Sequence, residues 1–215
     1  MPPSKINFPK AFKILLNEVD DYQTPIVDLI KIQTNDPYKV LVATILSART
    51  KDQVTSLAAS RIFKKAPDFC GLRKLSKKRI EELIYPVGFY RNKAKFLFQL
   101  PEVIEKEFNG KIPDTIDELI KLPGVGRKTA NLVVAVAFDK PAICVDTHVH
   151  RIMNIWNYIN TDSPFETEMA LRKKLPKKYW LDVNRVLVSF GQHLCRPVSP
   201  HCNKCPINKL CPRSF

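Results

Sequence analysis

The decapeptide LPGVGRKTAN, residues 122–131, ends one helix sharply and starts another. Proline and glycine interrupt the short apolar helix before it, and Arg127 opens a run that continues as LVVAVAF. We expect Gly124 and Gly126 to adopt backbone dihedrals closed to other residues and to let another backbone come near. The N–H groups and the dipole at the start of the second helix form a site for a phosphate. The sequence predicts a phosphate-binding helix-hairpin-helix at about 115–137, unless the glycine-rich turn is only a tight corner.

The charge of the chain indicates a polyanionic partner. Its 215 residues include 35 Lys and Arg but 21 Asp and Glu, a formal net charge of +14, and the cations occur along the whole sequence. Such an excess usually indicates nucleic acid, although a solvated basic surface or contact with an anionic membrane face gives the same composition. The N-terminus has no apolar signal segment, and no stretch approaches about 18 consecutive apolar residues. We expect a soluble, unexported monomer that does not enter a membrane, cytoplasmic and nucleoid-associated if the source is prokaryotic.

Helical periodicity runs through nearly the whole chain, with apolar residues at three- and four-residue intervals and prolines between the segments. The hydrophobic content of 45% is sufficient for a real core, and we predict an all-α protein. The helix at 38–48 follows an Asp36-Pro37 cap and is hydrophobic nearly all round, so it is expected at the centre. The other expected helices lie at about 50 onward, 77–83, 91–108, 116–122, 127–138, 147 onward, and twice within 164–194.

Several local signals indicate where these helices begin, bend and pack. Thr50 and Gln53 fit a capping box, and Asp146 is placed to cap the helix that follows it. Pro101 is expected to kink or divide the helix that contains it. The buried stripe of the helix that starts near 50 is expected to consist of Val54, Leu57, Ala58 and Ile62.

Four of the six cysteines crowd into a segment near the C-terminus with the spacing C-x6-C-x2-C-x5-C. They are Cys195, Cys202, Cys205 and Cys211. In a reducing compartment this clustering favours a metal centre over disulfides. Zinc accepts four cysteines, but the common zinc patterns pair two C-x2-C units, and ferredoxin spacings also differ. Cys70 and Cys144 lie alone and are expected to be buried small hydrophobes.

The decapeptide, the later VDTH at 145–148 and the cysteine loop together resemble the endonuclease III family of base-excision DNA glycosylases. The resemblance covers nearly the whole chain in the right order. It implies an all-α, two-domain helix-hairpin-helix DNA glycosylase fold with a C-terminal iron-sulfur cluster loop. The domains would be a six-helix barrel at 30–139 and an iron-sulfur cluster domain formed by 1–29 and 140–215. The four clustered cysteines would bind a 4Fe-4S cluster.

The resemblance also implies two catalytic residues. Lys128 would attack C1′ of a damaged nucleotide and displace the base, assisted by Asp146. The chemistry suits an amine, since it can form a Schiff base that acidifies C2′ and releases the 3′ phosphate by β-elimination. Beside Arg127 at a helix N-terminus the ammonium form is disfavoured, which makes the neutral amine more available. A carboxylate can stabilise the positive charge on the sugar and help to remove the lysine proton.

A glycosylase must take its target nucleotide out of the stack, and a side chain must fill the gap. Arg49 occupies the position where relatives commonly have a glutamine that enters this gap, and arginine can hydrogen-bond an orphaned guanine. Phe89 falls where relatives place an apolar wedge, with a core phenylalanine as the alternative. Asp52 and His148 match family positions near the DNA. On the hairpin, contacts with the DNA are expected at Gly124, Gly126 and Arg127.

These features predict a bifunctional DNA glycosylase and AP lyase that removes oxidised pyrimidines from double-stranded DNA containing damaged bases or abasic sites. A thymine or uracil mismatch glycosylase is an alternative, favoured by Arg49. A non-catalytic iron-sulfur DNA-binding module is another, and Lys128 discriminates against it.

Overall fold

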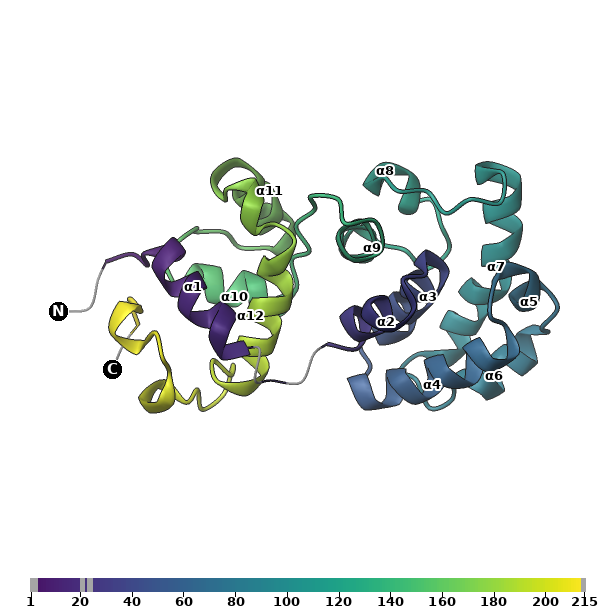
Figure 1. Cartoon of the computed structure of the whole chain (residues 1–215), viewed down its shortest axis with the longest axis horizontal. Helices are drawn as coiled ribbons and strands as arrows, with labels where there is room; N and C mark the ends of the chain where they lie inside the picture. The colour runs from purple at the N-terminus through teal and green to yellow at the C-terminus, as the bar shows by residue number, and fades with distance from the viewer. Residues whose placement is uncertain (1–3, 20–21, 23–24, 214–215) are drawn as a thin grey trace. The chain divides into compact units, whose positions relative to one another are not determined.

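The computed structural model describes residues 4–19, 22 and 25–213, and the secondary structure within them is entirely helical. Twelve α-helices and three short 3-10 helices follow one another along this part of the chain (Figure 1). The predicted all-α class is therefore confirmed. None of the helices in the described residues has the length and apolar character needed to span a membrane.

The chain divides into two compact units with separate cores. Pro25–Ala142 forms what we call the hairpin unit, and Met1–Thr24 with Ile143–Phe215 forms the cysteine-loop unit. The hairpin unit contains eight helices, α2 to α9, among its described residues. The expected six-helix barrel at 30–139 and cluster domain at 1–29 with 140–215 stay predictions.

The hairpin unit is built around α3 (Pro37–Ser47), as its all-round hydrophobicity predicts. The Asp36 carboxylate accepts a hydrogen bond from the Tyr38 N–H at 2.9 Å, and Pro37 occupies the first turn, so the helix starts as predicted. α3 packs against α2, α4, α7 and α9 (Figure 1). The other helices of the unit are α2 (Ile26–Thr34), α4 (Asp52–Lys65), α5 (Phe69–Arg73), α6 (Lys77–Ile84), α7 (Tyr90–Phe108), α8 (Ile116–Leu119) and α9 (Arg127–Phe138).

Two predictions about α4 are wrong. The helix begins at Asp52 with Lys51 at the N-cap and no side-chain cap, so Thr50 forms no capping box. In the predicted stripe Ala58 and Ile62 are buried and Val54 packs against the core, but Leu57 is 64% exposed, whereas Thr55 is fully buried. The Thr55 hydroxyl donates to the Lys51 carbonyl at 3.2 Å, so this side chain can enter the core with its hydrogen bond satisfied.

Pro101 does not divide the long helix of the hairpin unit. α7 is continuous through it, and Pro101 is itself buried. The helix ends as predicted, with Asn109 and Gly110 at φ 51° and 76° and the Gly110 N–H donating to the Ile104 carbonyl at 3.0 Å. Cys70 on α5 is exposed, so the prediction that it is buried is wrong.

The cysteine-loop unit joins segments from both ends of the sequence around an aromatic core. Phe8 and Phe12 of α1 stack at 5.1 Å, and Trp156 and Phe190 are buried in the same cluster. The Ile6 N–H donates to the Trp156 carbonyl at 3.0 Å, which ties the N-terminal segment to the later chain. Cys144 is buried, as predicted. The helices are α1 (Phe8–Val19), α10 (Thr147–Ile155), α11 (Pro164–Lys174), α12 (Asp182–His193), η1 (Lys177–Tyr179), η2 (Cys202–Lys204) and η3 (Asn208–Leu210).

Candidate active site and cysteine cluster

The hairpin turn between α8 and α9 uses its two glycines for different reasons. Gly124 has φ +77°, and a Cβ there would lie 2.6 Å from the Phe96 ring, so both the dihedral and the packing require glycine. Gly126 has φ −88° and is the N-cap of α9, so the predicted need for an unusual dihedral is wrong at this position. A Cβ on Gly126 would meet no atom within 4 Å. The missing side chain therefore leaves the N-terminal end of α9 open to an approaching group.

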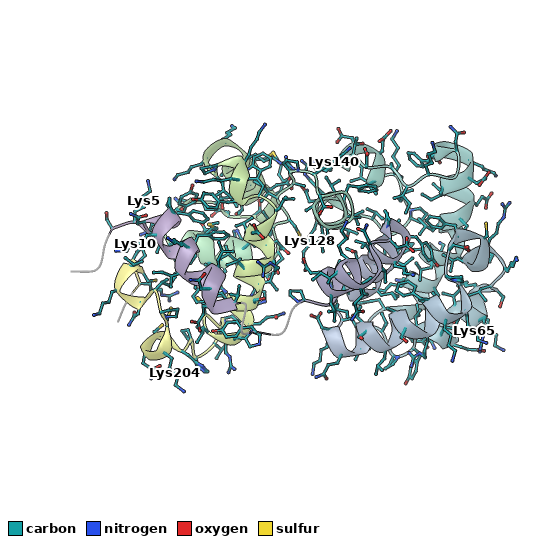
Figure 2. The ribbon with its side chains drawn as sticks, in the orientation of Figure 1. Lys5, Lys10, Lys65, Lys128, Lys140 and Lys204 are labelled. Atoms are coloured by element: carbon teal, nitrogen blue, oxygen red, sulfur yellow. The ribbon has the colours of Figure 1, made fainter. Side chains whose placement is uncertain are left out.

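Lys128, labelled in Figure 2, is the second residue of α9, and it is an exposed residue. The first turn that carries it is anchored by Asn131, a fully buried polar residue whose amide donates to the Arg127 carbonyl at 3.1 Å. Sequence reasoning missed Asn131, because a polar residue inside an apolar helix gives no sign of which neighbour satisfies it. The α9 N-terminus thus combines a phosphate-binding dipole with an accessible amine.

Asp146 belongs to the cysteine-loop unit and caps α10. Its Oδ1 accepts a hydrogen bond from the Val149 N–H at 2.9 Å, which confirms the predicted cap. His148, two residues further on, is partly exposed, and its ring lies directly against α12 at Gly191. A Cβ on Gly191 would come within 2.4 Å of His148 Nδ1, so glycine is required there. This contact could not be predicted from local patterns, since the two residues are far apart along the chain.

Arg49 and Phe89, which are each predicted to enter the gap in the DNA, belong to different loops but lie in contact in the hairpin unit. Both have left-handed backbones, with φ 54° and 56°, and the Arg49 guanidinium carbon lies 5.6 Å from the centroid of the Phe89 ring. Phe89 is 60% exposed, so the alternative of a core phenylalanine is wrong. The two side chains line a cavity of about 270 Å³ together with Lys93, Phe96 and other residues.

Asp52 has a structural partner within the hairpin unit. Its Oδ2 accepts a hydrogen bond from the Ile26 N–H at 3.2 Å, at the start of α2. A carboxylate at this position stabilises the positive end of α2 and joins it to α4. A contact of Asp52 with DNA stays a prediction.

The four clustered cysteines line one small cavity of about 30 Å³ in the cysteine-loop unit, with Trp156 and Phe190 on its apolar side. Burial raises the pKa of the Cys205 thiol to about 11, and it also raises the pKa values of Cys195 and Cys211. Arg151 donates to the Cys195 sulfur at 3.6 Å and to its carbonyl oxygen. Four thiols around one cavity fit a group that is bound by four thiolates and whose positive charge deprotonates them. The cysteine side chains share this cavity but do not converge on one metal-ion position, since among the described residues no set of three or more His, Cys, Asp or Glu does so.

Comparison with known proteins identifies the class. Residues 42–177 match the model of the HhH-GPD superfamily base excision DNA repair proteins. Endonuclease III of Thermotoga maritima is 42% identical over 176 residues, covering 82% of this chain and 83% of the relative. Endonuclease III of Bacillus subtilis is 36% identical, covering 94% and 92%. The chain spans about half of a longer relative, the chloroplastic endonuclease III homolog 2 of Arabidopsis thaliana, which is 43% identical and 48% covered.

Solved structures give the same fold. A trapped endonuclease III–DNA covalent intermediate superposes with a TM-score of 0.84 at 35% identity, covering 95% of this chain and 93% of the other. A thermostable thymine-DNA glycosylase gives 0.77 at 28% identity, covering 94% and 96%. The fold and the matched residues define a helix-hairpin-helix DNA glycosylase of base excision repair. Within that class the chain belongs to the endonuclease III family, and it is a DNA glycosylase and AP lyase.

Proposed function

We propose that this enzyme removes oxidised pyrimidines from duplex DNA and cleaves the strand 3′ to the abasic site through a Schiff base on Lys128. One observation carries the proposal: Lys128 is exposed in the first turn of α9, close along the chain to Gly126, where an added Cβ would meet no atom within 4 Å. A phosphate bound at this helix end places a nucleotide sugar near the amine. The relative trapped covalently on DNA, 35% identical over almost the whole chain, supports a covalent step here.

The proposed reaction begins when the Lys128 amine attacks C1′ of the damaged nucleotide. The glycosidic bond breaks, and its electron pair leaves with the base. The sugar ring then opens to a Schiff base, loss of a proton from C2′ expels the 3′ phosphate, and water hydrolyses the imine to release the lysine. Asp146 stabilises the positive charge that develops on the sugar and accepts the lysine proton. Its Oδ1 is used as the cap of α10, and the second carboxylate oxygen serves this role.

The DNA partner is duplex containing damaged bases or abasic sites, bound by a monomer. The net charge of +14 supports affinity for the phosphate backbone, with Gly124, Gly126 and Arg127 at the hairpin. Arg49 and Phe89 fill the gap that the extruded nucleotide leaves, because both are exposed side by side. His148 contacts the DNA from the cysteine-loop unit.

A 4Fe-4S cluster would be held by the four cysteines that line the small cavity, namely Cys195, Cys202, Cys205 and Cys211. When bound, it supplies a cross-link between the C-terminal loop and the rest of its unit, and a redox centre. Arg151 orients the first of these ligands through its bonds to Cys195. Analysis of purified protein should find about four iron atoms per chain. Stoichiometric zinc would contradict the assignment.

Borohydride trapping at an abasic site tests the Lys128 mechanism. The wild type is expected to form a covalent adduct, and Lys128→Gln is expected to form none while binding the same duplex with little change in affinity. Lys140→Gln is the matched control, since Lys140 lies beyond the other end of α9 and pairs with Asp114 at 2.7 Å (Figure 2). A wild type that binds abasic duplex without forming the adduct would rule out the Schiff base.

A thymine or uracil mismatch glycosylase is the second candidate. Arg49 and the similarity to the thermostable thymine-DNA glycosylase favour it. Turnover of thymine glycol, dihydrouracil, uracil:guanine and thymine:guanine duplexes separates the two functions. Faster release of uracil and thymine from the two mismatched duplexes than of the two oxidised bases from theirs would establish this second candidate.

A further inference from the structure

Lys93 is a buried cation that the proposed catalytic and DNA-contact residues leave unexplained. It lies in the first turn of α7, and only 6% of its surface is exposed. A buried ammonium loses its hydration, and a cation is also disfavoured near a helix N-terminus. Burial accordingly lowers the pKa of Lys93 to about 8. The surrounding structure must compensate for both costs.

The compensation comes from the segment that carries Arg49. Lys93 Nζ donates to the Leu46 carbonyl at 2.7 Å, the Ala48 carbonyl at 2.5 Å and the Thr50 hydroxyl at 3.2 Å. An ammonium has three N–H donors, so these three acceptors satisfy it. Because α3 ends at Ser47, the two carbonyls belong to its C-terminal end, where the helix dipole favours a cation.

Gly88 also contacts the segment that carries Arg49. The Gly88 N–H donates to the Thr50 hydroxyl at 3.1 Å, and a Cβ on Gly88 would lie 2.5 Å from the Arg49 carbonyl oxygen. Arg49 and Phe89 have left-handed backbones that side chains disfavour, and such conformations persist only where the surroundings impose them. Lys93 and Gly88 supply these surroundings.

We propose that Lys93 is a positioning residue for nucleotide extrusion. Its ammonium holds residues 48–50 so that Arg49, in contact with Phe89, is already in place to enter the gap in the duplex. The inference rests on the proposed function, in which these two exposed side chains fill that gap. Lys93 touches neither the DNA nor the reacting atoms and acts through the backbone of the Arg49 segment.

Fluorescence of 2-aminopurine next to an abasic-site analogue reports the unstacking that this pair produces. At saturating protein, the increase in 2-aminopurine fluorescence is expected to be severalfold smaller with Lys93→Met than with the wild type. The affinity of this variant for duplex DNA should be about tenfold weaker, similar to the loss of one stacking contact. Lys95→Met is the matched control, because it removes the same charge from an exposed position on the same helix. The control should change either quantity by less than about twofold. Equal behaviour of the two variants would overturn the proposal.

A double-mutant cycle with Arg49→Ala separates positioning from general support of the fold. If Lys93 acts through Arg49, Lys93→Met should cause almost no further loss of affinity in the Arg49→Ala background. The same loss in both backgrounds would show a merely structural role and overturn the proposal. Should Lys93→Met fail to fold, the same double-mutant cycle is measured with Lys93→Gln, which keeps an N–H donor group.

Borohydride trapping by the wild type distinguishes the two levels of inference. A wild type without an adduct removes the proposed Lys128 mechanism, whatever the fluorescence shows. An adduct together with indistinguishable Lys93→Met and Lys95→Met proteins removes only the role of Lys93.

Discussion

The first turns of α7 and α9 each carry a lysine, and the two lysines have opposite environments. Lys128 is exposed beside Gly126, where a side chain would meet no atom within 4 Å. Lys93 is 6% exposed and donates to three acceptors from another segment. The dipole disfavours a cation in both turns. The surroundings of each turn therefore determine what its lysine can do: carbonyls at the end of α3 enclose Lys93, whereas the surroundings of Gly126 leave the α9 turn accessible.

Replacing each lysine by methionine should give the largest contrast in stability. Lys93→Met leaves buried acceptors without a donor and should lower the free energy of unfolding by about 2–3 kcal/mol. Lys128→Met should change it by less than about 0.5 kcal/mol, as expected for an exposed residue. Urea unfolding followed by far-UV circular dichroism measures both, with Lys95→Met as the control. Similar losses for Lys93 and Lys128 would remove the contrast.

The two glycines of the hairpin turn offer a smaller contrast. Gly124→Ala meets the Phe96 ring and a positive φ, so we expect a loss of about 1–3 kcal/mol in the free energy of unfolding. Gly126→Ala meets neither obstacle and should be nearly neutral for stability. It should instead weaken binding to duplex DNA, because its methyl group narrows the approach to the start of α9. Equal destabilisation by the two substitutions would contradict the separate reasons given for them.

The smallest expected effect is the pH dependence that Lys93 contributes. Its pKa is lowered to about 8 in the folded protein, while the unfolded chain keeps the ordinary value of 10.5. Between these values the unfolded state binds more protons, so the contribution to stability rises with pH and is lost as the pH falls through about 8. The wild type should therefore gain about 1 kcal/mol relative to Lys93→Met per pH unit between about 8 and 10.5. A constant difference between pH 7 and pH 10 would show that Lys93 does not titrate there.

Local signals in the sequence were sufficient for the elements that depend on neighbouring residues. The Asp36 and Asp146 caps form as predicted, and α7 ends at Phe108 as its expected range predicts, because these features depend on residues a few positions apart. Thr50 does not act as a cap, since its hydroxyl accepts hydrogen bonds from Gly88, in the turn before α7, and from Lys93 in α7. Leu57 was wrongly predicted to be buried, because hydrophobicity alone does not determine which residues of α4 face the core.

The helical class, the hairpin with its lysine, and the spacing of four cysteines near the C-terminus could be predicted from the amino-acid sequence, since all of these depend on local residue order and residue type. Three contacts could be seen only in the folded protein: Arg49 with Phe89, His148 with Gly191, and Lys93 with the end of α3. These contacts join segments that are far apart along the chain. The free energy of each contact depends on how deeply its side chains are buried and on which backbone carbonyls still need a hydrogen-bond donor. Both are known only once the helices have packed together.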